Sequence, residues 1–318
     1  MSFDFLKLIF GLYIAIKGAD VLISNSTAIG RKLKISDFFI GLVIVGFGTS
    51  ISELLVSIEA VLSNSPDLSI GNILGSNIAN ILLVLSVVGF INSIKINKIS
   101  RFDIIFHLVI HLAFFLIFTF YKFDFLFGIL FLTSFIFYMI YSFKNSMVSS
   151  EINSEVNFDS LSKFSYKKPV IFGLPIVVIS IIITLFGVNI SVESAIKISD
   201  NLNIPDSFIG LSVIAIGTSL PELVTSIAAA KRKKSAIIFC TIIGSNIYNL
   251  LFILGISSLF ELFNYQKKIL ELDVIFLSLI VTLFSFTLLK RYDINLKFSL
   301  ICLFGYLFYI SNLVMRNF

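Results

Sequence analysis

Gly48–Glu53 (GTSISE) and Gly217–Glu222 (GTSLPE) decide how this chain folds, because each stretch places a glutamate inside an otherwise apolar run. A second pair of matching stretches follows, Gly75–Asn80 (GSNIAN) and Gly244–Asn249 (GSNIYN). Each later copy begins 169 residues after its earlier counterpart, as 217 − 48 and 244 − 75 show. The sequence therefore contains a repeated unit, and each unit carries a carboxylate where a membrane protein rarely tolerates one.

The composition is that of a membrane protein. Of the 318 residues, 57% are hydrophobic and 14% are charged, and the mean hydropathy is +1.02. A soluble domain has about 25% charged residues. The apolar runs are roughly 20 residues long, the length that crosses a hydrocarbon core as a helix. They lack the alternation of a membrane barrel, so we expect an all-α polytopic membrane protein whose first apolar run is a membrane helix and not a cleaved signal.

Ten spans are predicted, five on each side of a polar segment. The apolar runs place them at 5–29, 38–62, 70–91, 104–120, 125–143, 170–198, 207–230, 236–260, 270–289 and 296–314. The polar segment is rich in Ser, Asn, Glu and Lys and is expected to be a flexible linker. We therefore divide the chain into a first repeat at 1–144, a linker at 145–168 and a second repeat at 169–318.

The basic residues predict how the spans are oriented. If loops are assigned alternately to the two sides of the membrane, 17 of the 24 Lys and Arg residues fall on one side. The positive-inside rule places that side, which includes the linker, in the cytoplasm and both termini outside. This distribution explains the net charge of +5 without a nucleic-acid partner. Because five is an odd number of spans, the second repeat must cross the membrane in the opposite sense from the first.

The two halves match at polar positions as well as apolar ones. In an ungapped alignment of 37–60 with 206–229, 13 of 24 residues are identical, and 74–85 matches 243–254 at 7 of 12. Apolar composition alone would not align Gly, Thr, Ser, Asn and Glu in register. Inverted repeats of this kind build secondary transporters that bind their ions at the repeat interface near the midplane.

The repeated polar residues predict an oxygen-lined cation site. Thr49 and Ser50 lie four and three residues before Glu53, so all three share one helix face, and Ser76 and Asn80 are also four apart. The second copy supplies the same set as Thr218, Ser219, Glu222, Ser245 and Asn249. Oxygen ligands suit Ca²⁺ and Na⁺, and the absence of an accompanying His–Cys cluster disfavours a soft transition metal.

Energetics favour a cation as the partner of the two glutamates. An ionised carboxylate at the bilayer centre costs about 2.5–3.5 kcal/mol on insertion scales, and two facing carboxylates also repel each other. One divalent ion, or else sodium ions or protons, would neutralise the pair. A lone glutamate could be a protonated packing residue, but a duplicated glutamate with Thr, Ser and Asn beside it favours ion exchange.

These motifs resemble the alpha repeats of the cation/calcium exchanger superfamily, and the closest resemblance is to prokaryotic sodium/calcium exchangers. The resemblance implies alternating-access exchange of Na⁺ for Ca²⁺, with Glu53 and Glu222 as shared ligands of both ions. By the same resemblance, Asn80 and Asn249 line the central site, and the carbonyls of Gly46 and Ala215 donate backbone oxygens. The sodium sites would be completed by Thr49, Ser50, Ser76, Thr218, Ser219 and Ser245. The first and sixth spans would slide against this core.

Two positions depart from the family pattern. The family usually has GTS-x-P-E in both copies, and here Ser52 stands where the second copy has Pro221. A kink in the second span must then depend on Gly46, Gly48 or Ser52, which puts the symmetry of the two gates in question. Potassium-dependent relatives commonly carry an acid at the position of Asn249, so potassium co-transport is not expected.

The sequence leaves alternatives to sodium/calcium exchange. The same glutamates could serve a calcium/proton antiporter or an exchanger of other divalent ions, and a cation channel is disfavoured because no filter segment is evident. An enzyme is not expected, since the repeats hold no nucleophile–base pair, and no cofactor or obligatory protein partner is implied. The linker is too short for a regulatory calcium-binding domain. His107 and His111 are interpreted as packing residues or an interfacial polar contact.

Overall fold

The computed structural model describes residues 2–62, 66–96, 99–148, 160–201, 215–260, 265 and 267–317. In the first half the described helices are α1 (Ser2–Leu33), α2 (Asp37–Ile40), α3 (Phe47–Thr49), α4 (Ile51–Leu62), α5 (Pro66–Ala79), α6 (Leu85–Ile91), α7 (Arg101–Phe120) and α8 (Phe125–Val148). In the second half they are α9 (Ser160–Lys167), α10 (Leu174–Asn201), α12 (Ala215–Lys231), α13 (Ser235–Ile247), α14 (Leu254–Ser257), α15 (Lys267–Leu289) and α16 (Leu296–Asn317).

Short π-helical stretches join several of these helices into longer spans. Gly41–Gly46 connects α2 to α3, Asn80–Val84 connects α5 to α6, and Tyr248–Ile253 connects α13 to α14. A fourth stretch, Pro169–Gly173, leads into α10. Counted as joined spans, the described helices fall where the ten apolar runs predict them, apart from α9.

Seven of the described helices are long and apolar enough to cross a membrane, judged by length and composition. An eighth span is the pair 38–49 and 51–62, whose two parts bend by 43° at Ser50. The predicted first and seventh spans correspond to α1, which also carries several charges, and to the described part of α12. The broken helix expected near the first glutamate is therefore present.

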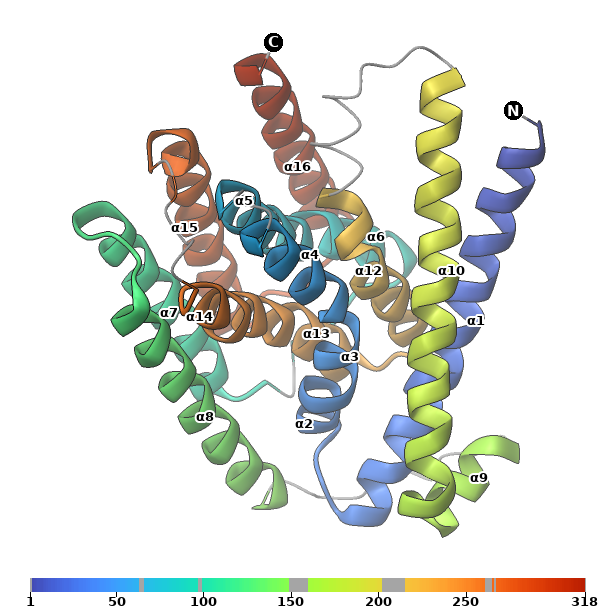
Figure 1. The fold of residues 1–318 in the computed structure, drawn as a ribbon. Helices are drawn as coiled ribbons and strands as arrows, with labels where there is room; N and C mark the ends of the chain where they lie inside the picture. The colour runs from blue at the N-terminus through green and yellow to red at the C-terminus, as the bar shows by residue number, and fades with distance from the viewer. Residues whose placement is uncertain are drawn as a thin grey trace.

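α1 and α10 lie side by side along one flank of the molecule (Figure 1). Their contacts run in opposite directions along the two helices. A Cβ on Gly11 would lie 2.5 Å from Ser191 Oγ, whereas one on Gly18 would lie 2.6 Å from Thr184 Oγ1. The helices are thus antiparallel, as inverted repeats require, and small residues let their backbones approach closely.

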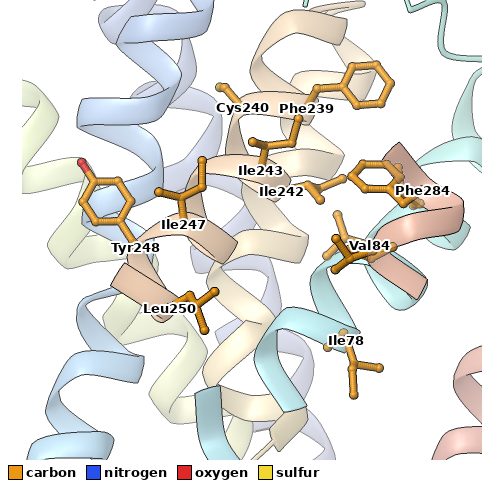
Figure 2. Close-up of a cluster of buried hydrophobic side chains, with 14 of the residues drawn as sticks. Ile78, Val84, Phe239, Cys240, Ile242, Ile243, Ile247, Tyr248, Leu250 and Phe284 are labelled. Carbon is orange, nitrogen blue, oxygen red and sulfur yellow. The ribbon is translucent and has the colours of Figure 1, made fainter. Parts of the chain in front are cut away.

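α4, α5, α12 and α13 pack together at the centre of the fold (Figure 1). Figure 2 shows the apolar layer around α13, in which Ile242 and Phe239 lie toward Phe284 of α15 and Val84. The π-helical stretch after α2 crosses α13 so closely that a Cβ on Gly41 would collide with Cys240 Sγ. This glycine lets the two halves interlock next to the repeated motifs.

The remaining helices surround this centre. α7 contacts α15, α8 contacts α14, and α16 contacts α6. Both termini lie at one end of the molecule, and α9 lies at the opposite end (Figure 1). α9 occupies part of the segment expected to be a flexible linker and is fixed to α1, because buried Ser165 Oγ donates a hydrogen bond to Asn25 Oδ1.

Three helices end with a basic residue in the left-handed backbone conformation. Lys34, Lys233 and Arg291 follow α1, α12 and α15 with φ of 57°, 54° and 56°. In each case the next residue's N–H bonds a carbonyl five residues earlier, as Ile35 N does to Gly30 O at 2.8 Å. Basic side chains at helix C-termini interact favourably with the helix dipole. All three ends belong to the side that the loop charges assign to the cytoplasm.

Candidate functional site

The two repeated glutamates lie at the interface of the two halves. Glu53 on α4 and Glu222 on α12 are both completely buried. Ser50, from the first repeat, donates its hydroxyl to Glu222 Oε1 at 3.2 Å. Ser245, on α13, donates to the same oxygen at 3.2 Å. One carboxylate oxygen of Glu222 is thus held by hydroxyls from both halves of the chain.

Glu53 is held differently, by the residue beside it. Ser52 Oγ lies 2.9 Å from Glu53 Oε2, 3.0 Å from Thr49 O and 3.3 Å from Thr218 O in the other repeat. A hydroxyl has one hydrogen to donate, and the carboxylate is both the nearest and the charged acceptor. The carbonyl oxygens are the weaker acceptors of this hydroxyl.

The hydroxyl residues of the motifs also meet across the interface. Ser76 Oγ lies 3.2 Å from Thr218 Oγ1, and Thr218 Oγ1 lies 3.2 Å from Asn72 Oδ1. Thr49 Oγ1 donates to Gly46 O at 3.2 Å. Ser219 is 1% exposed, and its hydroxyl has no hydrogen-bond partner among the described residues. Hydroxyls of both repeats therefore surround the glutamates.

The amides of the second motif pair cross between the repeats. Asn80 Nδ2 donates to Asn246 Oδ1 at 3.1 Å, and Asn249 Nδ2 donates to Asn77 Oδ1 at 2.9 Å. Each bond joins the last asparagine of one copy to the first asparagine of the other. All four side chains are completely buried.

Four buried oxygen atoms at this interface have no hydrogen-bond donor in the described part of the chain. They are Glu53 Oε1, Glu222 Oε2, Asn80 Oδ1 and Asn249 Oδ1. Each repeat contributes one carboxylate oxygen and one amide oxygen at matching positions. Buried acceptors without donors are costly, and a cation satisfies several of them at once. The donor set is composed of oxygen atoms, the ligands that Ca²⁺ and Na⁺ take.

The sodium/calcium exchanger protein family matches residues 3–144 and 172–315, one segment from each half. The chain belongs to this family. It is 34% identical to the sodium/calcium exchanger MaX1 of Methanosarcina acetivorans over 91% of both chains. It also resembles the sodium–calcium exchanger NCX_Mj soaked with 10 mM Na⁺, with a TM-score of 0.82 at 30% identity and coverage of 97% and 98% of the two chains. An uncharacterized membrane protein of Methanocaldococcus jannaschii is 34% identical over 79% of this chain and 80% of its own.

This membership confirms the predicted family and the ten-helix inverted repeat. Within the exchanger, the structure brings together most of the residues that the motifs nominate. Ser50, Ser245 and Glu222 form one hydrogen-bonded group. Ser52 lies between Glu53 and the Thr218 backbone oxygen, and Ser76 meets the Thr218 side chain. Asn80 and Asn249 are the donors of the two side-chain hydrogen bonds between the repeats.

The backbone carbonyls of Gly46 and Ala215 are the remaining predicted ligands. The Gly46 carbonyl accepts hydrogen bonds from Thr49 Oγ1 at 3.2 Å and from Ser50 N at 3.0 Å. A carbonyl oxygen has two lone pairs, so in this conformation a cation would compete with the Thr49 hydroxyl for Gly46. Ala215 begins the described part of α12, and its surroundings lie outside the described residues. Both stay predictions as ligands.

The sequence interpretation missed residues that complete the exchanger's polar centre. Asn72 donates to Glu53 O at 3.2 Å and to Ser57 Oγ at 2.9 Å, which fixes α5 against α4. Asn77 and Asn246 are the crossing partners described above. Their identity in both copies was the signal available, because they stand three residues before Asn80 and Asn249 and share their helix faces.

Of the two interpretations of the histidines, packing or an interfacial polar contact, the structure places the pair as buried packing residues that also contact polar groups. His107 and His111 of α7 are 0% and 1% exposed, and their ring centroids are 4.4 Å apart. His107 Nε2 lies 3.4 Å from Asn246 Nδ2, and His111 Nε2 lies 3.3 Å from Asn77 Nδ2. The pair lies in the core because α7 packs against α13.

Proposed function

We propose that this chain is a secondary active antiporter that exchanges Na⁺ for Ca²⁺ across a membrane by alternating access. The observation that carries the proposal is the set of four buried, donor-free oxygens on Glu53, Glu222, Asn80 and Asn249. Each half of an inverted repeat contributes two of them. MaX1 and NCX_Mj, to which the chain is similar, are named sodium/calcium exchangers.

Calcium fits the arrangement because it neutralises both glutamates at once. Ca²⁺ accepts about 6–8 oxygen ligands, including bidentate carboxylates. Glu53 and Glu222 would supply the charge, and the two asparagine carbonyls would supply neutral ligands. When Ca²⁺ leaves, the carboxylates repel each other and need new counter-charges in a low-dielectric site.

Sodium ions supply those counter-charges. Hydroxyl oxygens beside a carboxylate suit a monovalent cation that needs fewer charged ligands. The residues proposed to complete sodium sites around Glu53 and Glu222 are Thr49, Ser50, Ser76, Thr218, Ser219 and Ser245, and all six are buried. We propose that the exchange is electrogenic and that Na⁺ enters as Ca²⁺ leaves under an inward sodium gradient.

Alternating access is assigned to α1 and α10. Their close contact through Gly11, Gly18 and Gly187 forms one unit beside the ion-binding helices. Close packing of small residues between these two helices would let them move together as a rigid body. An exposed ion pair, Arg232 Nε to Asp20 Oδ1 at 3.3 Å, connects α1 to the end of α12. Such a pair contributes little free energy, so motion can break it.

Topology follows from the loop charges. We propose that residues 1–144 and 169–318 are the two exchanger repeats, joined by a cytoplasmic segment at 145–168 in a prokaryotic inner membrane. Both termini would lie outside. Their location at one end of the molecule, opposite α9, supports this proposal (Figure 1).

Calcium uptake into sodium-loaded proteoliposomes tests the function. We expect uptake that depends on the outward sodium gradient and that falls to background in Glu53→Gln and Glu222→Gln. Glu59→Gln is the matched control, since Glu59 lies on the same helix as Glu53 and is exposed. Uptake driven by a pH gradient without sodium would support calcium/proton exchange instead, and activity in both glutamate variants would contradict the proposed site.

A cross-link tests the motion. Cysteines in place of Asp20 and Arg232, joined by a short bismaleimide, would tie α1 to the core. We expect exchange to stop while equilibrium Ca²⁺ binding persists, and reagent on either single-cysteine variant serves as the control. Exchange that continues after complete cross-linking would rule out sliding of α1 against the core.

A further inference from the structure

The buried histidine pair is outside the proposed ion ligands, yet it contacts both asparagines that hold them. His111 Nδ1 lies 2.7 Å from the backbone oxygen of His107. That oxygen can only accept, so Nδ1 carries the hydrogen. In a neutral imidazole the other ring nitrogen, Nε2, is then an acceptor, and it faces Asn77 Nδ2 at 3.3 Å.

This assignment fixes the direction of a chain of amides. Because the NH₂ group of Asn77 points to His111, the carbonyl oxygen of Asn77 points the other way. Asn249 must meet that oxygen with its own NH₂ group, and the Nδ2–Oδ1 distance is 2.9 Å. The remaining Asn249 atom, Oδ1, is buried and has no donor among the described residues. Asn249 therefore presents an acceptor at the ion site.

A parallel chain runs through His107 with one difference. Asn246 Nδ2 lies 3.4 Å from His107 Nε2 and also 3.4 Å from the backbone oxygen of Asn77. That backbone oxygen alone would orient the Asn246 amide. Asn246 then accepts from Asn80 at 3.1 Å, which leaves Asn80 Oδ1 without a donor. The NH₂ group of Asn246 thus has two acceptors, whereas among the described residues the NH₂ group of Asn77 faces His111.

We propose that His111 is a positioning residue that makes Asn249 present a carbonyl oxygen, and not an NH₂ group, to the transported cation. The proposal rests on the proposed function for the identity of that cation. An NH₂ group in the same place would carry partial positive charge toward the ion. The positions matching His107 and His111 in the second repeat are Phe276 and Ile280, so one histidine pair from the first repeat orients amides of both.

Equilibrium binding of radioactive Ca²⁺ to the purified full-length protein tests the positioning role. In His111→Asn the shorter amide can still donate to the His107 carbonyl but no longer reaches Asn77. Loss of a group that orients a metal ligand commonly costs 10–100-fold in affinity, so we expect about a tenfold increase in the Ca²⁺ Kd. His111→Gln places an amide oxygen near the former Nε2 and should restore most of the affinity.

Two controls separate positioning from general damage. His107→Asn is the matched substitution one turn away, and we expect a smaller increase in Kd because Asn246 keeps its backbone acceptor. In an Asn249→Asp background an oxygen faces the cation whichever way Asn77 points, so His111 no longer selects the ligand atom. The other carboxylate oxygen would face Asn77 Oδ1 and favour the reversed Asn77 amide, which His111→Asn permits. The effect of His111→Asn should shrink to about twofold there, and a double-mutant cycle measures that coupling.

Equal effects of His111→Asn and His107→Asn, failure of His111→Gln to rescue, or an unchanged effect in the Asn249→Asp background would each overturn the proposal. Transport is measured separately in proteoliposomes. The predicted binding pattern without sodium-driven uptake would support the positioning role and contradict exchange. Sodium-driven uptake together with a wild-type Ca²⁺ Kd in His111→Asn would support exchange and contradict the positioning role.

Discussion

The two copies of the glutamate motif differ in how they hold their carboxylates. Glu222 receives hydroxyl hydrogen bonds from Ser50, at the break between α3 and α4, and from Ser245 on α13. Glu53 is contacted by Ser52, its neighbour in sequence, which stands at the position of Pro221. The repeat thus supplies matching charges but anchors them differently.

The bend in the first copy forms without a proline. The span without the proline is broken by 43° at Ser50, whereas α12 continues through Pro221 as one helix from Ala215 to Lys231. Ser52 Oγ also lies 3.0 Å from Thr49 O across the break, so Ser52 borders the bend although its hydroxyl hydrogen is directed to Glu53. The inference that the kink would depend on the glycines or on Ser52 agrees with this geometry.

Removing the amide oxygens tests the symmetric part of the comparison and should have the largest effect. Asn80→Leu and Asn249→Leu each remove one oxygen that has no donor and replace asparagine by a side chain of similar shape. Hydrogen bonds to charged groups contribute about 1.5–3 kcal/mol, so the apparent KM for Ca²⁺ should rise about 10–100-fold in both variants. Calcium uptake in proteoliposomes measures it, with Asn92→Leu outside the site as the control. A large difference in KM between the two variants would contradict equivalent roles for the two asparagines.

Removing the hydroxyl of Ser52 tests the asymmetric part. Ser52→Ala deletes the donor to Glu53 Oε2 and should raise the KM for Ca²⁺ about tenfold, since the carboxylate loses a charge-assisted bond. Thr133→Ala, on the exposed surface of α8, is a suitable hydroxyl control. A KM unchanged from the wild type would show that Ser52 acts on the bend and not on the glutamate.

Replacing the proline of the second copy should have the smallest effect on affinity. Pro221→Ala supplies the N–H that α12 lacks at this position, which stabilises a helix interior. We expect the Tm to rise by about 3 °C, as a gain near 1 kcal/mol would produce, with little change in the KM for Ca²⁺. Differential scanning fluorimetry in detergent measures the Tm. A lower Tm would mean that the helix is adapted to the missing bond.

Much of the fold could be predicted from the sequence because membrane insertion imposes long apolar runs and charged loops. The ten spans, their inversion and the pairing of the glutamates followed from length, charge distribution and the offset of 169 residues. These features depend on neighbouring residues or on a constant offset along the chain, so they can be predicted without knowing which helices pack together.

The polar network behind the ligands could not be predicted in the same way. Its bonds join residues far apart in sequence, as Asn249 joins Asn77, and depend on how the helices cross. The histidines lie outside the repeated motifs, so only the packing of α7 against α13 revealed what they contact. Ser52 was noticed as a missing proline, whereas its hydrogen bond to Glu53 required the side-chain geometry.

The π-helical stretches at Asn80–Val84 and Tyr248–Ile253 have a consequence for how this fold can be altered. They include the same positions in both repeats, since Asn80 and Asn249 are 169 residues apart. A π-bulge holds one residue more than an α-helix needs over the same length. Each stretch therefore has the effect of a one-residue insertion, which rotates α6 relative to Asn80 and α14 relative to Asn249. A one-residue deletion there would turn α6 or α14 by about 100° relative to the asparagine.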